Sequence, residues 1–301
     1  MLYNPSQGSG FLIMFTNVYI ITVSIQCPDK KGIISDVTSF IYKMMGNILY
    51  IDQYVDRKNK AFFMRLEAEF DKKHNSYNDF IEAFSNGPCK KFKISWKHRL
   101  NSVKQKMAIF VSKHDHCLYD LLGRYKSGEL DVEIPFIVSN HIKAKKIADT
   151  FKVDFYHTPI DFHTKDSSEK KQLELLIKHK IDFVVLARYM QIIPEKIIEK
   201  FKNKIINIHH SFLPAFPGAK PYHSAFERGV KIIGATSHYV TKELDAGPII
   251  EQGVTQVTHS HSVDELVSKG KDLEKIVLSN AVKNHIKQKV MVYKNKTVIF
   301  N

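Results

Sequence analysis

An asparagine and a histidine two residues apart are the side chains of this sequence best placed to do chemistry together. Asn207 and His209 belong to residues 207–214, which directly follow a predicted strand. Because residues i and i+2 of an extended chain point to the same side, both side chains can reach one small group. An amide N–H and a protonated imidazole are both hydrogen-bond donors. Together they suit the stabilisation of an oxyanion that forms at a carbonyl carbon.

A carboxylate that would complete such a site lies further along the chain. Asp245 stands in the turn of residues 244–248, two positions before Gly247. Because glycine has no Cβ, the backbone of this turn can approach a ligand closely. Asp245 is therefore the candidate for proton transfer beside the two donors.

The elements that must position these residues come from the second part of the chain. From Met107 onward, predicted strands alternate with predicted helices, which favours an α/β fold with a doubly wound, mostly parallel, Rossmann-like sheet. In such sheets ligands bind beyond the carboxyl ends of the strands, where Asn207 and His209 lie. The predicted strands span residues 107–112, 134–139, 153–156, 181–187 and 204–208.

Two helices of this part have clear local patterns. Residues 168–179 carry an apolar stripe made by Leu173, Leu176 and Ile177. The last helix begins with the capping-box spacing of Ser262 and Glu265, and two short strands, 289–293 and 297–300, follow it. Its residues expected to point inward are Leu266, Leu273, Ile276 and Val277.

In the earlier part of the chain, the spacing of apolar residues alternates between strand-like and helix-like. The predicted elements follow the order βαββαβ, which is typical of a ferredoxin-like unit. We expect strands at 18–25, 48–55, 61–70 and 91–95, a helix that ends with Gly46 as its C-cap, and a second helix at 76–85. The first helix presents one apolar face, formed by Ile33, Ile34, Val37, Phe40, Ile41, Met44 and Met45. The predicted boundaries are an N-terminal extension (1–17), a first domain (18–95), a linker (96–105) and a second domain (106–301).

Composition limits the class of protein without naming it. The chain has 301 residues, of which 44% are apolar and 25% charged, as in ordinary globular proteins. No run of eighteen apolar residues and no secretory signal occurs, so we expect a cytoplasmic protein that does not enter a membrane. Three widely spaced cysteines give no basis for disulfides or a zinc site, and we expect neither a metal nor a cofactor.

The net charge of +14 allows more than one interpretation. The lysines are spread along the chain instead of being clustered with aromatic residues, so we do not expect nucleic-acid binding. They can simply form a solvated surface. Alternatively, their positive potential attracts an anionic substrate.

The spaced motif around the three candidate residues resembles the signature of formyltetrahydrofolate-using transferases and hydrolases. Residues 207–214 are followed by His238-x-Val240 and by Leu244-Asp245-x-Gly247-Pro248 with two isoleucines after it. The resemblance implies that Asn207, His209 and Asp245 form the catalytic trio and that His238 lies near them. Taken singly, Asn207 could instead cap a turn and His209 could be a packed histidine.

Within that superfamily, the chain is most similar to the formyltetrahydrofolate deformylases. Glycinamide ribonucleotide formyltransferases carry a glycine-rich phosphate loop after the first strand, whereas residues 111–117 here contain no glycine. Methionyl-tRNA formyltransferases carry a further β-barrel domain, and we expect the 56 residues after Asp245 to be used by the last helix and hairpin. The deformylase resemblance covers residues 18–300 and includes an ACT domain, with departures at the N-terminal extension, Pro217 and His261. Its matching segments are 28–33, 46–48, 52–53, 62–65, 139–141, 218–222 and 296–300.

The resemblance implies hydrolysis of 10-formyltetrahydrofolate to formate and tetrahydrofolate, which supplies formate for purine synthesis and balances the one-carbon folate pool. Asn207 and protonated His209 would stabilise the oxyanion, and Asp245 would take the water proton directly or through a second water. Whether His209 or Asp245 then protonates N10 stays open. A chain that only regulates, without activity, is the alternative that an intact trio disfavours. The substrate-binding residues that the resemblance implies are Arg188, Tyr189, Met190, Gln191, Ile192, His238 and Leu244.

Residues 188–192 follow a predicted strand, and in relatives the corresponding loop offers backbone hydrogen bonds to the pterin ring. An ordinary strand-to-helix connection is the other interpretation, with Arg188 as a surface charge.

The first domain carries a candidate regulatory site for a small amino acid, with glycine and methionine as first candidates. The helix start can hold a carboxylate, Asp29 can meet an ammonium group, and Gly32 lets the ligand come close. Asn47 would belong to the same pocket or to that of a neighbouring chain. Because ACT domains usually pair through their sheets, the resemblance implies a dimer or tetramer. The other interpretation is that Asp29 only caps the helix and the domain serves assembly.

Overall fold

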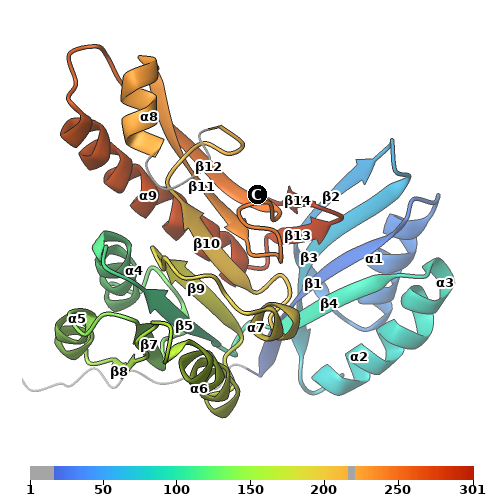
Figure 1. Cartoon of the computed structure of the whole chain (residues 1–301). Helices are drawn as coiled ribbons and strands as arrows, with labels where there is room; N and C mark the ends of the chain where they lie inside the picture. Colours follow the sequence, from blue (N-terminus) through green and yellow to red (C-terminus); the bar gives the residue numbers. More distant parts are fainter. Residues whose placement is uncertain (1–16, 216–220) are drawn as a thin grey trace, which may run out of the picture. The chain divides into compact units, whose positions relative to one another are not determined.

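The computed structural model describes residues 17–215 and 221–301 (Figure 1). The chain divides into two units, Met1–Val103 and Lys104–Asn301. Residues 1–16 of the predicted extension lie outside the described part of the chain, as do Pro217 and the matching residues 218–220.

The first unit has a four-stranded antiparallel sheet in the order β2-β3-β1-β4. The expected ferredoxin-like class is confirmed, because the two central strands pair along their whole length, from Val18 opposite Asp71 to Pro28 opposite Ala61. The strands are β1 (Val18–Pro28), β2 (Asn47–Asp56), β3 (Ala61–Asp71) and β4 (Ser95–Leu100). The helical segments are α1 (Ile33–Lys43), α2 (Tyr77–Phe84), the π-turn η1 (Ser85–Cys89) and α3 (Lys90–Phe92).

The core of this unit follows from the positions of its apolar residues. They alternate with other residues in the strands and recur every three or four residues in α1. Ile21, Val23 and Ile25 of β1 point to one side of the sheet, where Val37 and Ile41 of α1 meet them. Each such side chain contributes about 1.5–3 kcal/mol when fully buried. The expected face of α1 was too wide, because Ile34 and Met45 are exposed.

The end of α1 corrects the predicted role of Gly46. The residue with the left-handed backbone is Met45 (φ 56°), whereas the amide of Gly46 donates to Ile41 O at 2.9 Å. A Cβ on Gly46 would lie 2.4 Å from the Phe70 ring. Glycine is therefore needed here because an aromatic side chain packs directly on the backbone, and not because of backbone conformation.

The last strand of the sheet is not where the sequence predicted it. Residues 90–92 are helical, and β4 spans Ser95–Leu100, so the first residues of the predicted linker belong to the sheet. Trp96, His98 and Leu100 pair with Ile25, Val23 and Ile21 of β1, and the Trp96 ring packs 4.6 Å from that of Phe84. Basic residues lie between these inward positions and obscure the strand-like alternation. The sequence of this segment therefore resembles that of a polar linker.

The second unit contains an eight-stranded sheet in the order β12-β11-β10-β9-β5-β7-β8, with β6 beside β5 (Figure 1). Five parallel strands overlap the predicted ones: β5 (Gln105–Val111), β7 (Phe136–Ser139), β8 (Asp154–His157), β9 (Phe183–Ala187) and β10 (Ile205–His209). Three further strands were not predicted: β6 (Val132–Glu133), β11 (Ile232–Tyr239) and β12 (Ile249–Gln256). Because β11 and β12 are antiparallel to their neighbours, the sheet is mixed and mostly parallel. The closing hairpin is β13 (Val290–Tyr293) and β14 (Lys296–Ile299).

Helices cover both faces of this sheet. One core cluster joins Ile109 of β5 to α4, α5 and α9, and another joins Phe110 to α6 and α7. The capping box of Ser262 and Glu265 is confirmed at the start of α9. The helices are α4 (His116–Lys126), α5 (Ala144–Phe151), α6 (Lys165–Lys178), α7 (Glu195–Lys200), α8 (Pro221–Arg228) and α9 (Val263–Ile286).

Two residues expected to point inward from these helices do not. Ile177 of α6 and Ile276 of α9 are both about half exposed, at 49% and 52%. In α6 the buried apolar residues are Leu175 and Leu176, so the apolar stripe is rotated from its predicted position. Within the described residues, none of the helices combines the length and the apolar character that crossing a membrane requires.

We predict that Gly46→Ala destabilises the first unit by about 1–3 kcal/mol, because the new methyl group must displace the Phe70 ring from a packed core. Gly87→Ala is the matched control, since its Cβ would make only ordinary contact with Phe40 at 4.0 Å. Urea denaturation followed by the fluorescence of Trp96, the single tryptophan, measures both variants. Equal midpoints for the two variants would contradict the explanation.

Candidate active site

The two neighbouring strands β9 and β10 end at the same edge of the sheet, and the predicted residues lie at that edge. Asn207 and His209 come from β10, with the buried Ile208 pointing to the other side between them. The antiparallel strand β11 places His238 directly opposite Asn207. The unpredicted strand β11 is therefore what brings His238 into the site.

The turn that carries Asp245 is held in an unusual backbone conformation. Asp245 is left-handed, with φ 53°. A Cβ on Gly247 would lie 1.7 Å from the carbonyl oxygen of Tyr239. Glycine is thus required because the turn runs against the end of β11, which corrects the expected reason, approach to a ligand. From the closing hairpin, Asn295 Nδ2 donates to Ala246 O at 2.8 Å and holds the turn in place.

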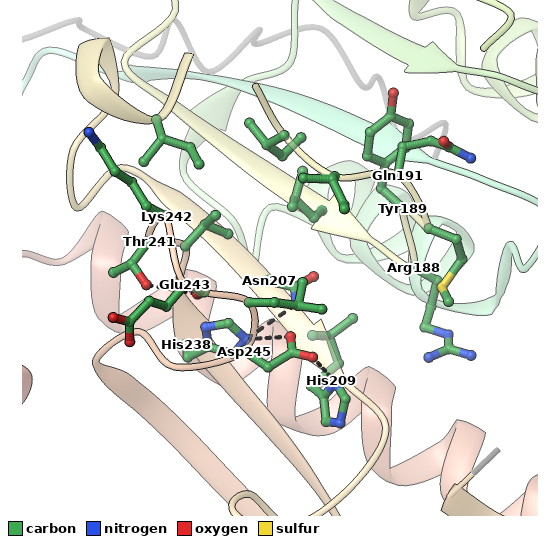
Figure 2. A pocket seen from close by; sticks show the side chains of 18 of the residues that line it. Arg188, Tyr189, Gln191, Asn207, His209, His238, Thr241, Lys242, Glu243 and Asp245 are labelled. Carbon is green, nitrogen blue, oxygen red and sulfur yellow. Dashed lines mark hydrogen bonds and ion pairs between the residues drawn. The ribbon is translucent and has the colours of Figure 1, made fainter. Parts of the chain in front are cut away.

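The polar groups form one connected set around the Asp245 carboxylate (Figure 2). His209 Nδ1 lies 3.1 Å from Asp245 Oδ2, and His238 Nε2 lies 3.4 Å from Asp245 Oδ1. Asn207 Nδ2 lies 3.2 Å from the same His238 Nε2. His238 Nδ1 lies 3.0 Å from Tyr239 O, so Nδ1–H donates to that carbonyl and Nε2 faces Asn207 and Asp245.

The two imidazoles set the charge of the carboxylate. Contacts with His209 first and then with His238 hold the pKa of Asp245 well below its usual range, against the opposing effect of partial burial. Asp245 is therefore ionised at any physiological pH. His209 Nε2 is buried and has no hydrogen-bond partner among the described residues, which leaves one donor position of the ring unused.

The trio lies in a pocket of about 400 Å³, a size that accommodates a small organic ligand. Residues 188–192 form the opposite side of the pocket (Figure 2). Every residue predicted to bind substrate lines this pocket, including His238 and Leu244. The pocket is also lined by residues that were not among the predicted site residues, namely Leu186, Ile193, Ile198, Ile208, His210 and residues 240–243. The last four could have been found, because they connect the two halves of the motif.

The loop of residues 188–192 is fixed by hydrogen bonds to the end of β5. Ser112 N donates to Arg188 O at 3.2 Å, and Met190 N donates to Ser112 Oγ at 2.9 Å. Tyr189 packs against Phe110, and Gln172 Nε2 donates to its hydroxyl at 2.9 Å. Burial raises the pKa of Tyr189 to about 12. Tyr189 therefore anchors the loop, whereas Met190 and Ile192 expose their side chains.

Arg188 is not the surface charge that one interpretation of the sequence allowed. Its side chain is 9% exposed, and its Nε lies 3.3 Å from Oε2 of Glu274, a residue of α9 that is 1% exposed. Glu274 also accepts hydrogen bonds from Tyr222 Oη at 2.7 Å and His116 Nε2 at 2.9 Å. Burial by itself raises the pKa of Glu274, but these partners together bring it below the ordinary value.

One group among residues 17–215 and 221–301 has the spacing of metal ligands, formed by His116, Cys117 and Glu274. A thiol must lose its proton to bind a metal, and burial raises the pKa of Cys117 well above its ordinary value. The Arg188 guanidinium beside Glu274 would also repel a cation. This group suits a hydrogen-bonded network better than a metal site.

Comparisons with known proteins find a matching family for each of the two units. The family model for formyl transferase matches residues 105–282, and that for the ACT domain matches residues 21–74. A formyltetrahydrofolate deformylase of Synechocystis is 47% identical over 93% of this chain and 98% of its own length. The crystal structure of a formyltetrahydrofolate deformylase from Pseudomonas syringae pv. tomato has a TM-score of 0.91, 40% identity and 96% coverage of both chains. Glycinamide ribonucleotide transformylase 1 from Symbiobacterium toebii gives a TM-score of 0.63 at 26% identity, over 67% of this chain and 97% of that one.

The fold and the site thus define a protein of the formyl transferase class with an N-terminal ACT domain. The match to the relatives extends through both units. The chain belongs to the formyltetrahydrofolate deformylase family.

We predict that the stability contributed by Asp245 is present above about pH 4, the ordinary range for an unfolded aspartate, and is lost as the pH falls further. The sign follows from the folded pKa, which lies below the unfolded one, so the unfolded chain takes up the proton first. The stability gap between wild type and Asp245→Asn should therefore narrow between about pH 5 and pH 2. Urea midpoints measured across this range give the gap, and parallel profiles would show that the two histidines do not hold the charged carboxylate.

Proposed function

We propose that the chain hydrolyses 10-formyltetrahydrofolate to formate and tetrahydrofolate, and that the second unit carries out this reaction. The observation that supports this most directly is the ionised Asp245, placed between two histidines and beside Asn207 at one side of a ligand-sized pocket. Tetrahydrofolate returns to the one-carbon folate pool, and formate is supplied to purine synthesis. The surplus of basic residues favours a substrate whose glutamate tail is negatively charged.

In this proposal, the pterin ring lies against residues 188–192 and the formyl group reaches the trio. The loop suits this role because its backbone is fixed by Ser112 while the side chains of Met190 and Ile192 remain exposed. Leu244 is exposed on the opposite side, next to Asp245. A rigid backbone between exposed apolar side chains offers both hydrogen bonds and contact area to a flat ring.

We assign the oxyanion to Asn207 and His209. A protonated His209 uses one N–H toward Asp245 and keeps the other, on the unpartnered Nε2, for the formyl oxygen. The Asn207 amide adds a second donor, and its contact with His238 fixes its orientation. Fixed donors stabilise the tetrahedral intermediate more than the planar formyl group, because charge develops only there.

We assign the water to Asp245, whose carboxylate is 23% exposed, more than either of the two histidines beside it. Because its pKa is low, the carboxylate is a weak base. The water therefore transfers its proton late, once its bond to the formyl carbon has made that proton acidic. The proton then moves through the coupled pair of Asp245 and His209 to N10, the C–N10 bond breaks, and formate leaves with the oxygen of the water.

Transfer of the formyl group to a ribonucleotide amine is the alternative activity on this fold. The loop between β5 and α4 is relevant to this alternative activity. Its residues 112–115 contain no glycine, and His116, which follows them, is held by Glu274. A backbone without glycine does not easily surround a phosphate group. The loop therefore favours water as the acceptor.

We further propose that the first unit binds a small amino acid near Asp29 and Gly32. Gly32 is left-handed (φ 90°) and forms the N-cap of α1 without a side-chain hydrogen bond, so Asp29 does not cap the helix. Apart from the residues directly bonded to it in the chain and the helix's own backbone, no described residue places a heavy atom within 4 Å of a Cβ built on Gly32, which leaves room for a ligand. Free amides at this helix start suit a carboxylate.

Asn47 does not belong to that same pocket within one chain. Asp29 N donates to Lys60 O, whereas Asn47 pairs with Glu69 at the other end of β3. Nine residues of extended chain separate these points by about 30 Å. Asn47 can take part only from a neighbouring chain, which fits the homo-oligomer, a dimer or tetramer, that we propose. Support for such pairing comes from β2, an edge strand with Leu49 and Ile51 exposed.

We place the enzyme in the cytoplasm. All three cysteines are free, and Cys27 and Cys117 are buried as thiols, as expected in a reducing compartment.

We predict that His209→Ala and Asp245→Asn each lower kcat by at least about a hundredfold, because each removes a fixed acid–base or oxyanion group. The double variant should lose little more than either single variant, since the two residues act as a unit. His259→Ala, which changes an exposed histidine outside the pocket, is the matched control. The kcat of all four variants is measured from formate release at saturating substrate concentration. Circular dichroism verifies that each variant is folded. Near-wild-type turnover in either single variant would exclude the proposed roles.

We predict that formate release from 10-formyltetrahydrofolate is unaffected by glycinamide ribonucleotide and by a metal chelator. Transfer to the ribonucleotide should be undetectable beside hydrolysis, because residues 112–116 offer no phosphate loop. The measurement follows formate and formylated ribonucleotide in the same reaction. A transfer rate equal to the hydrolysis rate would instead make the enzyme a transferase, and recovery of lost activity by zinc would reveal a metal site.

We predict that at least one amino acid, with glycine and methionine tested first, changes the hydrolysis rate, and that Asp29→Ala weakens this effect. An effector must bind the active and inactive states with different affinity to have any influence. Titration of the twenty amino acids into the assay, with calorimetry on both proteins, tests this. If none binds, the first unit serves assembly alone.

A further inference from the structure

A second cavity adjoins the catalytic pocket in the second unit. It has a volume of about 180 Å³ and is lined by residues of α4, α8 and α9 and by the residues before α4. Arg188 and His210 line both this cavity and the catalytic pocket, so these two side chains form the wall between them. His210 directly follows the proposed catalytic residue His209. A small molecule formed beside His209 is therefore one side chain away from the second cavity.

The described lining of this cavity is rich in basic groups. Glu274 is its one carboxylate, and the oxygens of Glu274 already contact Tyr222, His116 and Arg188. The pKa of His114 is lowered, first by partial burial and then by the positive charges of Arg188, His116 and Lys271. The basic residues are His114, His116, Arg188, His210, His223 and Lys271.

The balance of fixed charges favours an anion with a single charge. Apart from the histidines, Arg188 and Lys271 contribute two positive charges and Glu274 one negative charge, which leaves a surplus of one positive charge. A monoanion would neutralise this surplus, whereas a dianion such as phosphate would exceed it. The histidine N–H groups add hydrogen-bond donors around the same space.

We propose that this cavity binds formate, the product of the reaction, after it leaves the catalytic pocket. This inference rests on the proposed hydrolysis, because that reaction is the source of formate beside His209. The wall of Arg188 and His210 then separates the two products, since tetrahydrofolate remains against residues 188–192 while formate passes to the other side. Formate departs by this route without having to pass the folate.

The test measures binding of ¹³C-labelled formate by NMR line broadening, without folate present. Lys271→Gln combined with His223→Gln removes two donors from the cavity, and formate affinity should fall by about fivefold or more. Lys269→Gln, on the same helix but outside the cavity, is the matched control and should keep wild-type affinity. Added formate should inhibit hydrolysis less strongly in the double variant than in wild type. In Lys269→Gln the inhibition should equal that of wild type.

The outcomes separate this proposal from the proposed function. Equal formate affinity in all three proteins, or no binding to wild type, would overturn the formate site even if hydrolysis is intact. Displacement of formate by much tighter binding of inorganic phosphate would overturn it as well, because the cavity would then be a site for dianions. Formate binding that depends on Lys271 and His223 without any hydrolysis would instead overturn the proposed function.

Discussion

The contact between an ionised Asp245 and the imidazoles of His209 and His238 is the constraint on which the rest of the candidate site depends. A half-buried carboxylate keeps its charge only if donors surround it, and these donors come from two strands that run in opposite directions. The antiparallel pairing of β10 with β11 therefore has a chemical purpose as well as a structural one. The left-handed turn at Asp245, the close approach of Gly247 to Tyr239 and the hydrogen bond from Asn295 all serve to bring the carboxylate to the donors.

The two sides of the catalytic pocket differ in how they are built. On one side, charged and polar groups contact one another directly, so their positions are coupled. On the other side, the backbone of residues 188–192 is fixed from behind by Ser112 and by the buried Tyr189, and its exposed side chains are apolar. Chemistry and ligand contact are thus assigned to separate segments. The side formed by residues 188–192 can vary its exposed residues without disturbing the charge of Asp245.

Local patterns predicted the parallel strands and the capped last helix, because each depends on neighbours in sequence, whereas the trio was assigned through the resemblance of a spaced motif to a known family. The strand β11 was missed because Gly234, Thr236 and Ser237 occupy inner positions that a polarity pattern assigns to a loop. The strand β4 was hidden by the basic residues between Trp96 and Leu100. The burial of Arg188 by Glu274 could not be foreseen, since the two residues meet only in the folded chain. Spaced motifs therefore gave the residues of the site, whereas the partners that set their charge required the structure.

The buried carboxylate of Glu274 has a consequence for how enzymes on this fold diverge. It joins Arg188 after β9, His116 at the start of α4 and Tyr222 in α8, so three segments far apart in sequence depend on one side chain. Replacing residues 112–116 alone by a glycine-rich loop would remove His116 and leave the buried charge with fewer partners, and losing a hydrogen bond to a buried charged group costs about 1.5–3 kcal/mol. An evolutionary path from water to another acceptor would have to change these segments together, or pass first through loss of Glu274. The network thus acts as a barrier to a stepwise change of acceptor on this fold.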